Sequence, residues 1–104
     1  MIQAVFDRKN GKICKCSIKG HADYADAGQD VVCAAVSSAM QLAANLITES
    51  FHEMASVSAQ NSKIVISLGQ DSLAGETILE GLLTHLQCIS EEYPDNMKIQ
   101  ISEV

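Results

Sequence analysis

The sequence predicts an α+β domain in which two helices pack on one mixed or antiparallel sheet. Two long segments, 30–54 and 73–92, repeat apolar residues at helical spacing. Five shorter segments alternate apolar and polar residues, as half-buried strands do. The resulting order, β-β-α-β-β-α-β, is typical of the α+β class.

The first two strands are predicted at residues 1–7 and 13–20. The dipeptide Asn10-Gly11 between them favours a hairpin turn, because both residues adopt the positive φ angles that such a turn needs. Alternation in the second strand puts three residues on the side that faces the core: Cys14, Cys16 and Ile18. We therefore expect both cysteines of this strand to be core residues.

The longer helix is predicted from Asp30 to about Met54. Asp30 is a good N-cap, because its carboxylate can accept a hydrogen bond from a backbone N–H in the first turn. Residues 22–29 are small or polar and predict a loop. Two neighbouring apolar stripes predict burial against both the sheet and a partner: Val36, Met40, Ala43, Ile47 and Met54 in one, Val32, Ala35, Ala39, Leu42 and Leu46 in the other.

The second half of the chain is predicted to contain three strands and one helix, and the sequence shows no internal repeat. Strands are predicted at 56–59 and 63–68 around a short polar turn, followed by a helix over 73–92. Pro94 ends that helix, because proline disfavours the helical conformation in the residue before it. A last strand is predicted at 97–102.

Length and charge limit the possible functions. The chain has 104 residues, which suits a single domain over 1–104 and favours burial of a helix face in a homodimer. Seven Lys and Arg stand against thirteen Asp and Glu, a net charge of −6 that argues against direct nucleic-acid binding. The acidic balance fits a basic partner, but an ordinary soluble acidic protein is the simpler interpretation.

The sequence also predicts the cellular compartment. No apolar run approaches the roughly 20 residues that span a bilayer, and residues 1–7 lack the features of a signal peptide, so no membrane is expected. We expect a cytoplasmic protein whose four cysteines are thiols, with no metal and no cofactor. Cys14-x-Cys16 leaves a metal or redox protein as an alternative, although no second ligand pair follows at suitable spacing.

Cys33 is the leading candidate for chemistry. With Asp30 as the N-cap it falls in the first helical turn, where the helix dipole stabilises a thiolate. Its backbone N–H would then be available to an oxyanion, and Gly28 would allow another chain to approach closely. The alternative is a packed small hydrophobic residue, and the carboxylate of Asp30 opposes a thiolate unless it is engaged in capping bonds.

His21 closes the second predicted strand and can supply the base. A strand and a helix that pack as neighbours bring His21 within reach of Cys33, and such a pair supports nucleophilic acyl transfer. Ser37 lies one turn after Cys33 and can orient the imidazole, bind substrate or bond to its own backbone. The remaining candidates are given structural roles: His52 and His85 on the surface or at an interface, and Cys88 packed.

These residues resemble the bacterial ribosomal-processing cysteine proteases, called Prp. The resemblance covers Gly20-His21-Ala22, Tyr24-Ala25, Gly28, Asp30 and the run 31–37, Val-Val-Cys-Ala-Ala-Val-Ser. It implies a small cytoplasmic homodimer that removes a short N-terminal extension from a ribosomal protein, number twenty-seven of the large subunit.

The resemblance also implies roles for single residues. The family's nucleophile and base correspond to Cys33 and His21. Asp30 and Ser37 are expected to support them because of their positions beside Cys33, not because of the resemblance. The loop between them is implied to order around the substrate, which puts Gly20, Ala22, Tyr24 and Gly28 near the peptide. The alternative function is a non-enzymatic, ribosome-associated interaction module in which Cys33 is only packed.

Overall fold

The structure is a computed structural model that describes residues 1–20 and 27–104, with the backbone alone over 27–30. Its strands are β1 (Ile2–Lys9), β2 (Lys12–Lys19), β3 (Ala55–Gln60), β4 (Lys63–Leu68) and β5 (Met97–Glu103). Its helices are α1 (Ala27–Asn45), a single π-helical turn η1 (Leu46–Ser50) that continues α1, and α2 (Leu73–Glu92).

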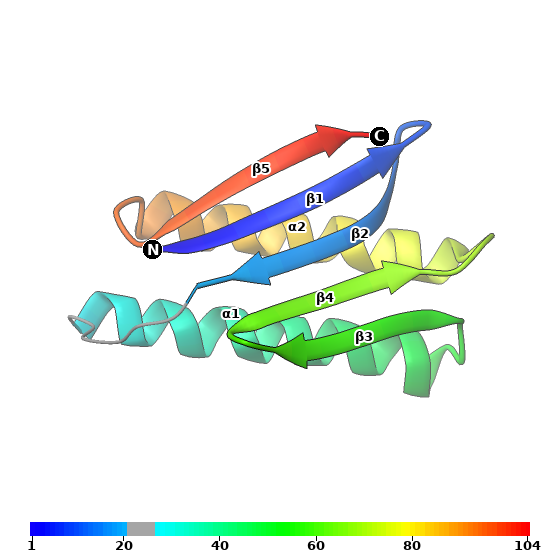
Figure 1. The fold of residues 1–104 in the computed structure, drawn as a ribbon, viewed down its shortest axis with the longest axis horizontal. Helices are drawn as coiled ribbons and strands as arrows, with labels where there is room; N and C mark the ends of the chain where they lie inside the picture. Colours follow the sequence, from blue (N-terminus) through cyan, green and yellow to red (C-terminus); the bar gives the residue numbers. More distant parts are fainter. Residues whose placement is uncertain (21–26) are drawn as a thin grey trace.

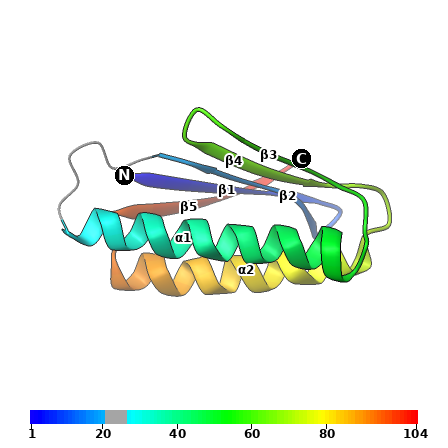
Figure 2. The same ribbon diagram turned by 90° about the horizontal axis from the view of Figure 1, so that it is seen from below.

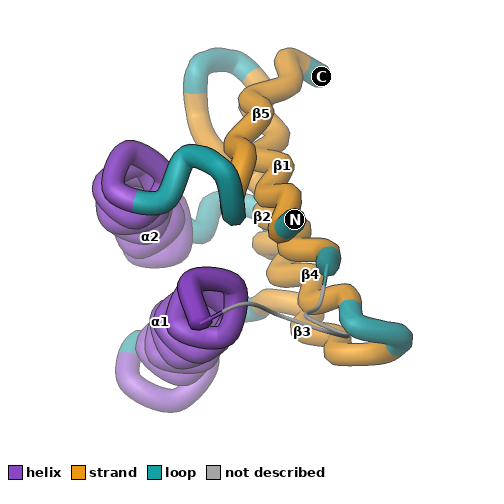
Figure 3. The backbone as a smooth tube through the Cα atoms, turned by 90° about the vertical axis from the view of Figure 1, so that its left-hand side faces the viewer, coloured by secondary structure: helices purple, strands orange, loops and turns teal. Residues whose placement is uncertain are grey.

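The strands form one mixed sheet in the order β3-β4-β2-β1-β5 (Figure 1). β5 runs parallel to β1, and the other neighbouring strands pair antiparallel. Both helices lie on the same face of the sheet, and the opposite face is uncovered (Figures 2 and 3). The predicted fold class is confirmed, with a mixed sheet.

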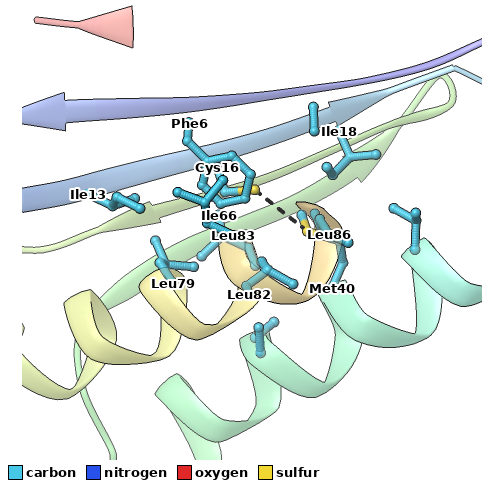
Figure 4. Close-up of a cluster of buried hydrophobic side chains, with 14 of the residues drawn as sticks. Phe6, Ile13, Cys16, Ile18, Met40, Ile66, Leu79, Leu82, Leu83 and Leu86 are labelled. Carbon is cyan, nitrogen blue, oxygen red and sulfur yellow. Dashed lines mark hydrogen bonds between the residues drawn. The ribbon is translucent and has the colours of Figure 1, made fainter. Parts of the chain in front are cut away.

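The core lies between the sheet and the two helices. Phe6 and Ile66 from the strands meet Met40 of α1 and Leu86 of α2, and all four side chains are buried (Figure 4). An ion pair of 2.5 Å between Arg8 and Glu80 also links β1 to α2 at the edge of this core. The helix-facing positions of the strands therefore hold the helical layer in place.

The alternation in β2 is interrupted by a β-bulge. The pairing with β1 shifts between Asp7 and Arg8, which leaves Cys14 as the extra residue. Cys16 is fully buried, whereas Cys14 is half-buried and its Sγ donates to the carbonyl of Asp7 at 3.4 Å. The prediction that both cysteines are core residues is therefore correct for Cys16 and wrong for Cys14, which is half-buried at the bulge and outside the core.

The ends of the first helix differ from the prediction. α1 begins at Ala27, so Asp30 lies inside the helix and is not its N-cap, and Gly28 lies in the first turn rather than in a loop. The helix ends with η1 at Ser50, and Met54 is 80% exposed instead of continuing an apolar stripe. An N-cap signal is local, and the neighbouring Ala27 and Gln29 tolerate helix, so the helix can begin earlier.

The apolar stripes of α1 have different fates. Val36, Met40 and Ile47 of the first stripe are buried in the core, as predicted. In the second stripe Val32 is buried, but Leu42 is 61% exposed. The first stripe therefore faces the sheet, whereas the second is buried at Val32 and exposed at Leu42.

One segment also corrects the expectation about apolar runs. Residues Val31–Ser50 are long and apolar enough to cross a membrane by length and composition alone, with a mean hydropathy of 1.6. In this fold the same segment supplies Val36, Met40 and Ile47 to the core, so its apolar character has a structural use.

Candidate active site

A surface cavity of about 430 Å³ lies where the start of α1 approaches one end of the sheet, at the left of Figure 1. Three parts of the chain line it. They are the strand ends (Ile2, Ile18 and Gly20), α1 (Cys33, Val36 and Ser37), and the hairpin between β3 and β4 (residues 59–64). The strand ends and the helix are the parts in which the sequence placed the reactive residues.

Cys33 lies on the wall of this cavity. It is half-buried and packs against the edge of the core, with Val36 behind it. Ser37 follows one helical turn later, is exposed, and lines the same cavity. The helix therefore presents a thiol and a hydroxyl side by side to one solvent-filled space.

The position of Cys33 in the helix corrects part of the predicted chemistry. Counted from Ala27, Cys33 is the seventh helical residue rather than the third. At that depth its backbone N–H is directed toward the carbonyl of Gln29, four residues earlier. Its backbone therefore does not supply the oxyanion donor that the sequence predicts.

The other thiols have different environments. Burial, together with the charge of Asp7, raises the pKa of Cys16 to about 12, and its Sγ lies 3.8 Å from Met40 Sδ inside the core. Cys14 is bonded to a backbone carbonyl in the bulge. Cys88 is exposed on α2, so the prediction that it is packed is wrong. None of these three lines the cavity.

Gly20 closes the cavity against the first strand. Its φ is +125°, and a Cβ there would lie 2.5 Å from the carbonyl oxygen of Met1, so a larger residue is excluded by both conformation and space. Its N–H donates to the carbonyl of Ser62 at 3.2 Å, which ties the end of β2 to the β3–β4 turn. Gly20 thus has a structural role at the rim in addition to its predicted place near substrate.

The β3–β4 turn is the part of the site that sequence reasoning missed. Asn61 and Ser62 both have positive φ, 53° and 60°, as the two central residues of a tight hairpin turn often do. The pairing of Ile18 with Ile64 brings this turn beside the end of β2. No local signal predicts that contact, because it depends on β4 being the neighbour of β2.

Several predicted site residues lie outside the described residues: His21, Ala22 and Tyr24. His21 follows Gly20 directly in the chain, and Gly20 lines the cavity. The other two histidines, His52 and His85, are exposed, as predicted, and neither lines the cavity.

Comparison with known sequences finds a family that matches most of this chain. Residues 1–98 match the family model described as cysteine protease Prp. The chain is 29% identical over 108 residues to the ribosomal processing cysteine protease Prp of Bacillus subtilis (strain 168), covering 95% of this chain and 96% of the relative. Its counterpart in Staphylococcus aureus (strain Mu50 / ATCC 700699) is 28% identical over 92 residues, with 86% and 87% covered.

Solved structures share the fold. The crystal structure of an essential ribosomal processing protease Prp from S. aureus, in complex with a substrate peptide, has a TM-score of 0.90 and 26% identity, covering 98% of this chain and 100% of that one. A Streptococcus mutans protein has a TM-score of 0.88 over 100% of this chain and 96% of its own, at 24% identity, a likeness of fold alone.

Proposed function

Because this chain belongs to the cysteine protease Prp family, it is a cysteine protease, and we propose that Cys33 is its nucleophile and His21 its general acid and base. The observation that carries the assignment is the cavity that Cys33 and Gly20 line together. Gly20 is the residue directly before His21, so His21 follows in the chain a residue that lines the cavity of Cys33. This juxtaposition makes an interaction module with a merely packed Cys33 the weaker alternative.

The proposed reaction is acyl transfer to sulfur followed by hydrolysis. His21 takes the proton of the Cys33 thiol, and the thiolate forms a bond to the carbonyl carbon of the scissile peptide. As the C–N bond breaks, the imidazolium of His21 returns the proton to the leaving amine. Water, deprotonated by His21, then attacks the thioester, which releases the carboxylate product and restores the thiol.

Ser37 is the candidate for stabilising the oxyanion or holding the peptide. Its hydroxyl is exposed in the cavity one turn from Cys33, whereas the backbone N–H of Cys33 lies within the helix. Asp30, inside α1, keeps a supporting role as an acidic residue near the start of the helix, where the macrodipole is favourable to it.

The proposed substrate is the precursor of large-subunit ribosomal protein number twenty-seven, from which the enzyme removes a short N-terminal extension. The Bacillus and Staphylococcus relatives are ribosomal processing proteases, and the Staphylococcus crystal structure is a complex with a substrate peptide, which supports a ribosomal substrate. The net charge of −6 favours association with a basic ribosomal protein. A cytoplasmic location, where such precursors are made, stays part of this proposal.

A homodimer is also part of the proposal. α1 and α2 border an outward groove of about 620 Å³ with an apolar lining that includes Leu42, Leu46 and Leu82. Leu42 is 61% exposed there, which fits the second apolar stripe predicted to meet a partner. A sedimentation measurement that finds only monomer at micromolar concentration would count against this part.

The decisive experiment is cleavage of a peptide that spans the junction between the extension and the mature protein. We expect Cys33→Ala to lower kcat/KM by more than about 1,000-fold. We expect His21→Ala to lower it by about 100-fold or more, the usual contribution of a general acid–base group. Cleavage that persists at wild-type rate in Cys33→Ala would refute the assignment.

One further variant serves as a control, and a second tests the role of Ser37. Cys88→Ser removes an exposed thiol outside the cavity and should leave kcat/KM unchanged. Ser37→Ala should lower kcat more than it raises KM, because an oxyanion donor acts mainly in the transition state. A rise in KM alone would instead place Ser37 in ground-state peptide binding.

A further inference from the structure

Three lysines lie in one row across the uncovered face of the sheet. The register pairs Lys98 with Gln3, Gln3 with Lys19, Lys19 with Lys63, and Lys63 with Gln60. These five residues form one line across all five strands, and each is exposed. We call Lys19, Lys63 and Lys98 the lysine row.

The lysine row is unusual in a chain of this charge. The whole molecule has seven Lys and Arg and a net charge of −6, yet three of the seven cations share one cross-strand line. Lys19 and Lys63 stand directly opposite each other, a like-charge pairing that costs stability. Within the described part of the chain, the ion pairs are made by Arg8 and Lys12, not by the row.

The rest of the uncovered face is polar and shallow. The outward positions of the next two rows are mainly Ser and Gln, together with two valines. One row consists of Val5, Ser17, Ser58, Val65 and Gln100, and the other of Asp7, Lys15, Ser56, Ser67 and Ser102. Asp7 is the one acidic residue among these outward positions, and it pairs with Lys15. We call these three rows together the open face.

A hollow of about 430 Å³ lies on the open face beside the lysine row. Lys19, Lys63 and Ser58 line it together with residues of the β3–β4 turn. The same turn separates this hollow from the cavity of Cys33, because Gln60, Asn61 and Lys63 line both. The basic surface therefore adjoins the catalytic cavity.

We propose that the open face binds the phosphate backbone of RNA, with the lysine row as the principal contact. Phosphate oxygens match ammonium, hydroxyl and amide donors, which is what this face offers. A protein partner would need an apolar centre, and two valines do not form one. The choice of RNA over other polyanions rests on the proposed ribosomal substrate, whereas the recognition of phosphate does not.

The same face limits the kind of recognition. It presents no aromatic side chain among its outward positions, so it offers no platform on which bases stack. Binding is therefore independent of sequence, dominated by charge and sensitive to salt. Composition alone argues against nucleic acid because it averages over the chain, and the register gathers the cations where phosphate can meet them.

Fluorescence anisotropy with a short labelled single-stranded RNA tests the proposal. We expect the double variant Lys19→Gln/Lys98→Gln to lose about tenfold in affinity and to flatten the slope of log K against log salt by about 1.4, at about 0.7 for each lost phosphate contact. Lys63 is left intact because it also lines the cavity of Cys33. The matched control Lys9→Gln/Lys12→Gln removes the same charge at the far end of the β1–β2 hairpin. It should change the affinity for RNA by less than about twofold.

Several results would overturn the proposal. Equal losses of RNA affinity in both double variants would mean that binding depends on net charge and not on the lysine row. Binding of poly-glutamate in preference to RNA would indicate an acidic protein partner. DNA of the same sequence binding more tightly than RNA would contradict the assignment, because the Ser and Gln side chains are expected to bond the 2′-hydroxyl.

The proposal and the protease assignment fail separately. The Lys19→Gln/Lys98→Gln variant should cleave the precursor peptide at the wild-type rate, since neither lysine lines the cavity of Cys33. A protein that binds RNA but fails to cleave that peptide refutes the proposed substrate and leaves phosphate recognition standing.

Discussion

The helical layer and the open face of the sheet carry opposite charges. Residues 27–50 and 73–92, which form the helices, contain six acidic residues and no Lys or Arg: Asp30, Glu49, Glu76, Glu80, Glu91 and Glu92. The open face, in contrast, has four lysines and one aspartate. The net charge of −6 is therefore distributed unevenly, with the acidic excess on the helices and a basic excess on the open face.

The difference in charge shows that the two surfaces have separate roles. The helix-facing side of the sheet makes the core, and α1 carries Cys33 at its margin. The open face makes no core, so its residues are constrained only by the strand conformation and by what they bind. Because the β3–β4 turn borders both, the cavity that Cys33 lines lies on the boundary between the two surfaces.

The largest expected effect comes from neighbouring residues of β4 that face opposite ways. Ile66 is fully buried toward the helices, whereas Val65 is half-buried on the open face. Ile66→Ala should destabilise the fold by about 2–5 kcal/mol, the usual cost of such a truncation in a core. Val65→Ala should cost about 1 kcal/mol or less, as measured by urea unfolding. Equal costs would mean that both faces of the sheet are covered.

A second prediction concerns the thiol on the helix-facing side of β2. Burial raises the pKa of Cys16 from 9.0 to about 12, so between these pH values the folded chain keeps a proton that the unfolded chain loses. The free energy of unfolding should therefore fall as pH rises from 9 to 12, by up to about 1.4 kcal/mol per pH unit. Cys16→Ala should remove this part of the slope. An unchanged slope in that variant would contradict the burial of the thiol.

The smallest expected effect is a gain in stability on the open face. Lys63→Glu places a carboxylate opposite Lys19 and should stabilise the fold by about 0.2–1 kcal/mol at low salt, less at high salt. The matched reversal Lys12→Glu removes an ion pair with Glu76 and should lower the urea midpoint instead. A lower midpoint for Lys63→Glu would show that the lysines of the row do not repel each other.

The sequence predicts much of the fold because the signals are periodic or local. The Asn10-Gly11 turn has the positive φ angles expected of it, 55° and 80°. The buried stripe of α1 is present as predicted, because its residues recur at helical spacing. The start of α1 is predicted less well, because Asp30 is compatible with both an N-cap and a first helical turn.

Two of the wrong predictions share a physical cause. The prediction that Cys14 is a core residue fails because a bulge adds one residue to β2. An alternating pattern in the sequence does not show where a bulge occurs. Cys88 is exposed although it lies on a helix with a strong apolar stripe, because the stripe covers only one side of α2. Each error concerns phase rather than the type of element.

By itself the sequence determined the order of the elements and singled out Cys33, with the motif that contains it, as the proposed nucleophile, since these depend on residue type and short spacing. Only the tertiary structure decided that the Asn61-Ser62 turn joins Cys33 at one cavity and that Lys98, Lys19 and Lys63 share one line. Both facts depend on which strand lies beside which. Strand order is set by packing between segments far apart in the chain, so no local pattern contains it.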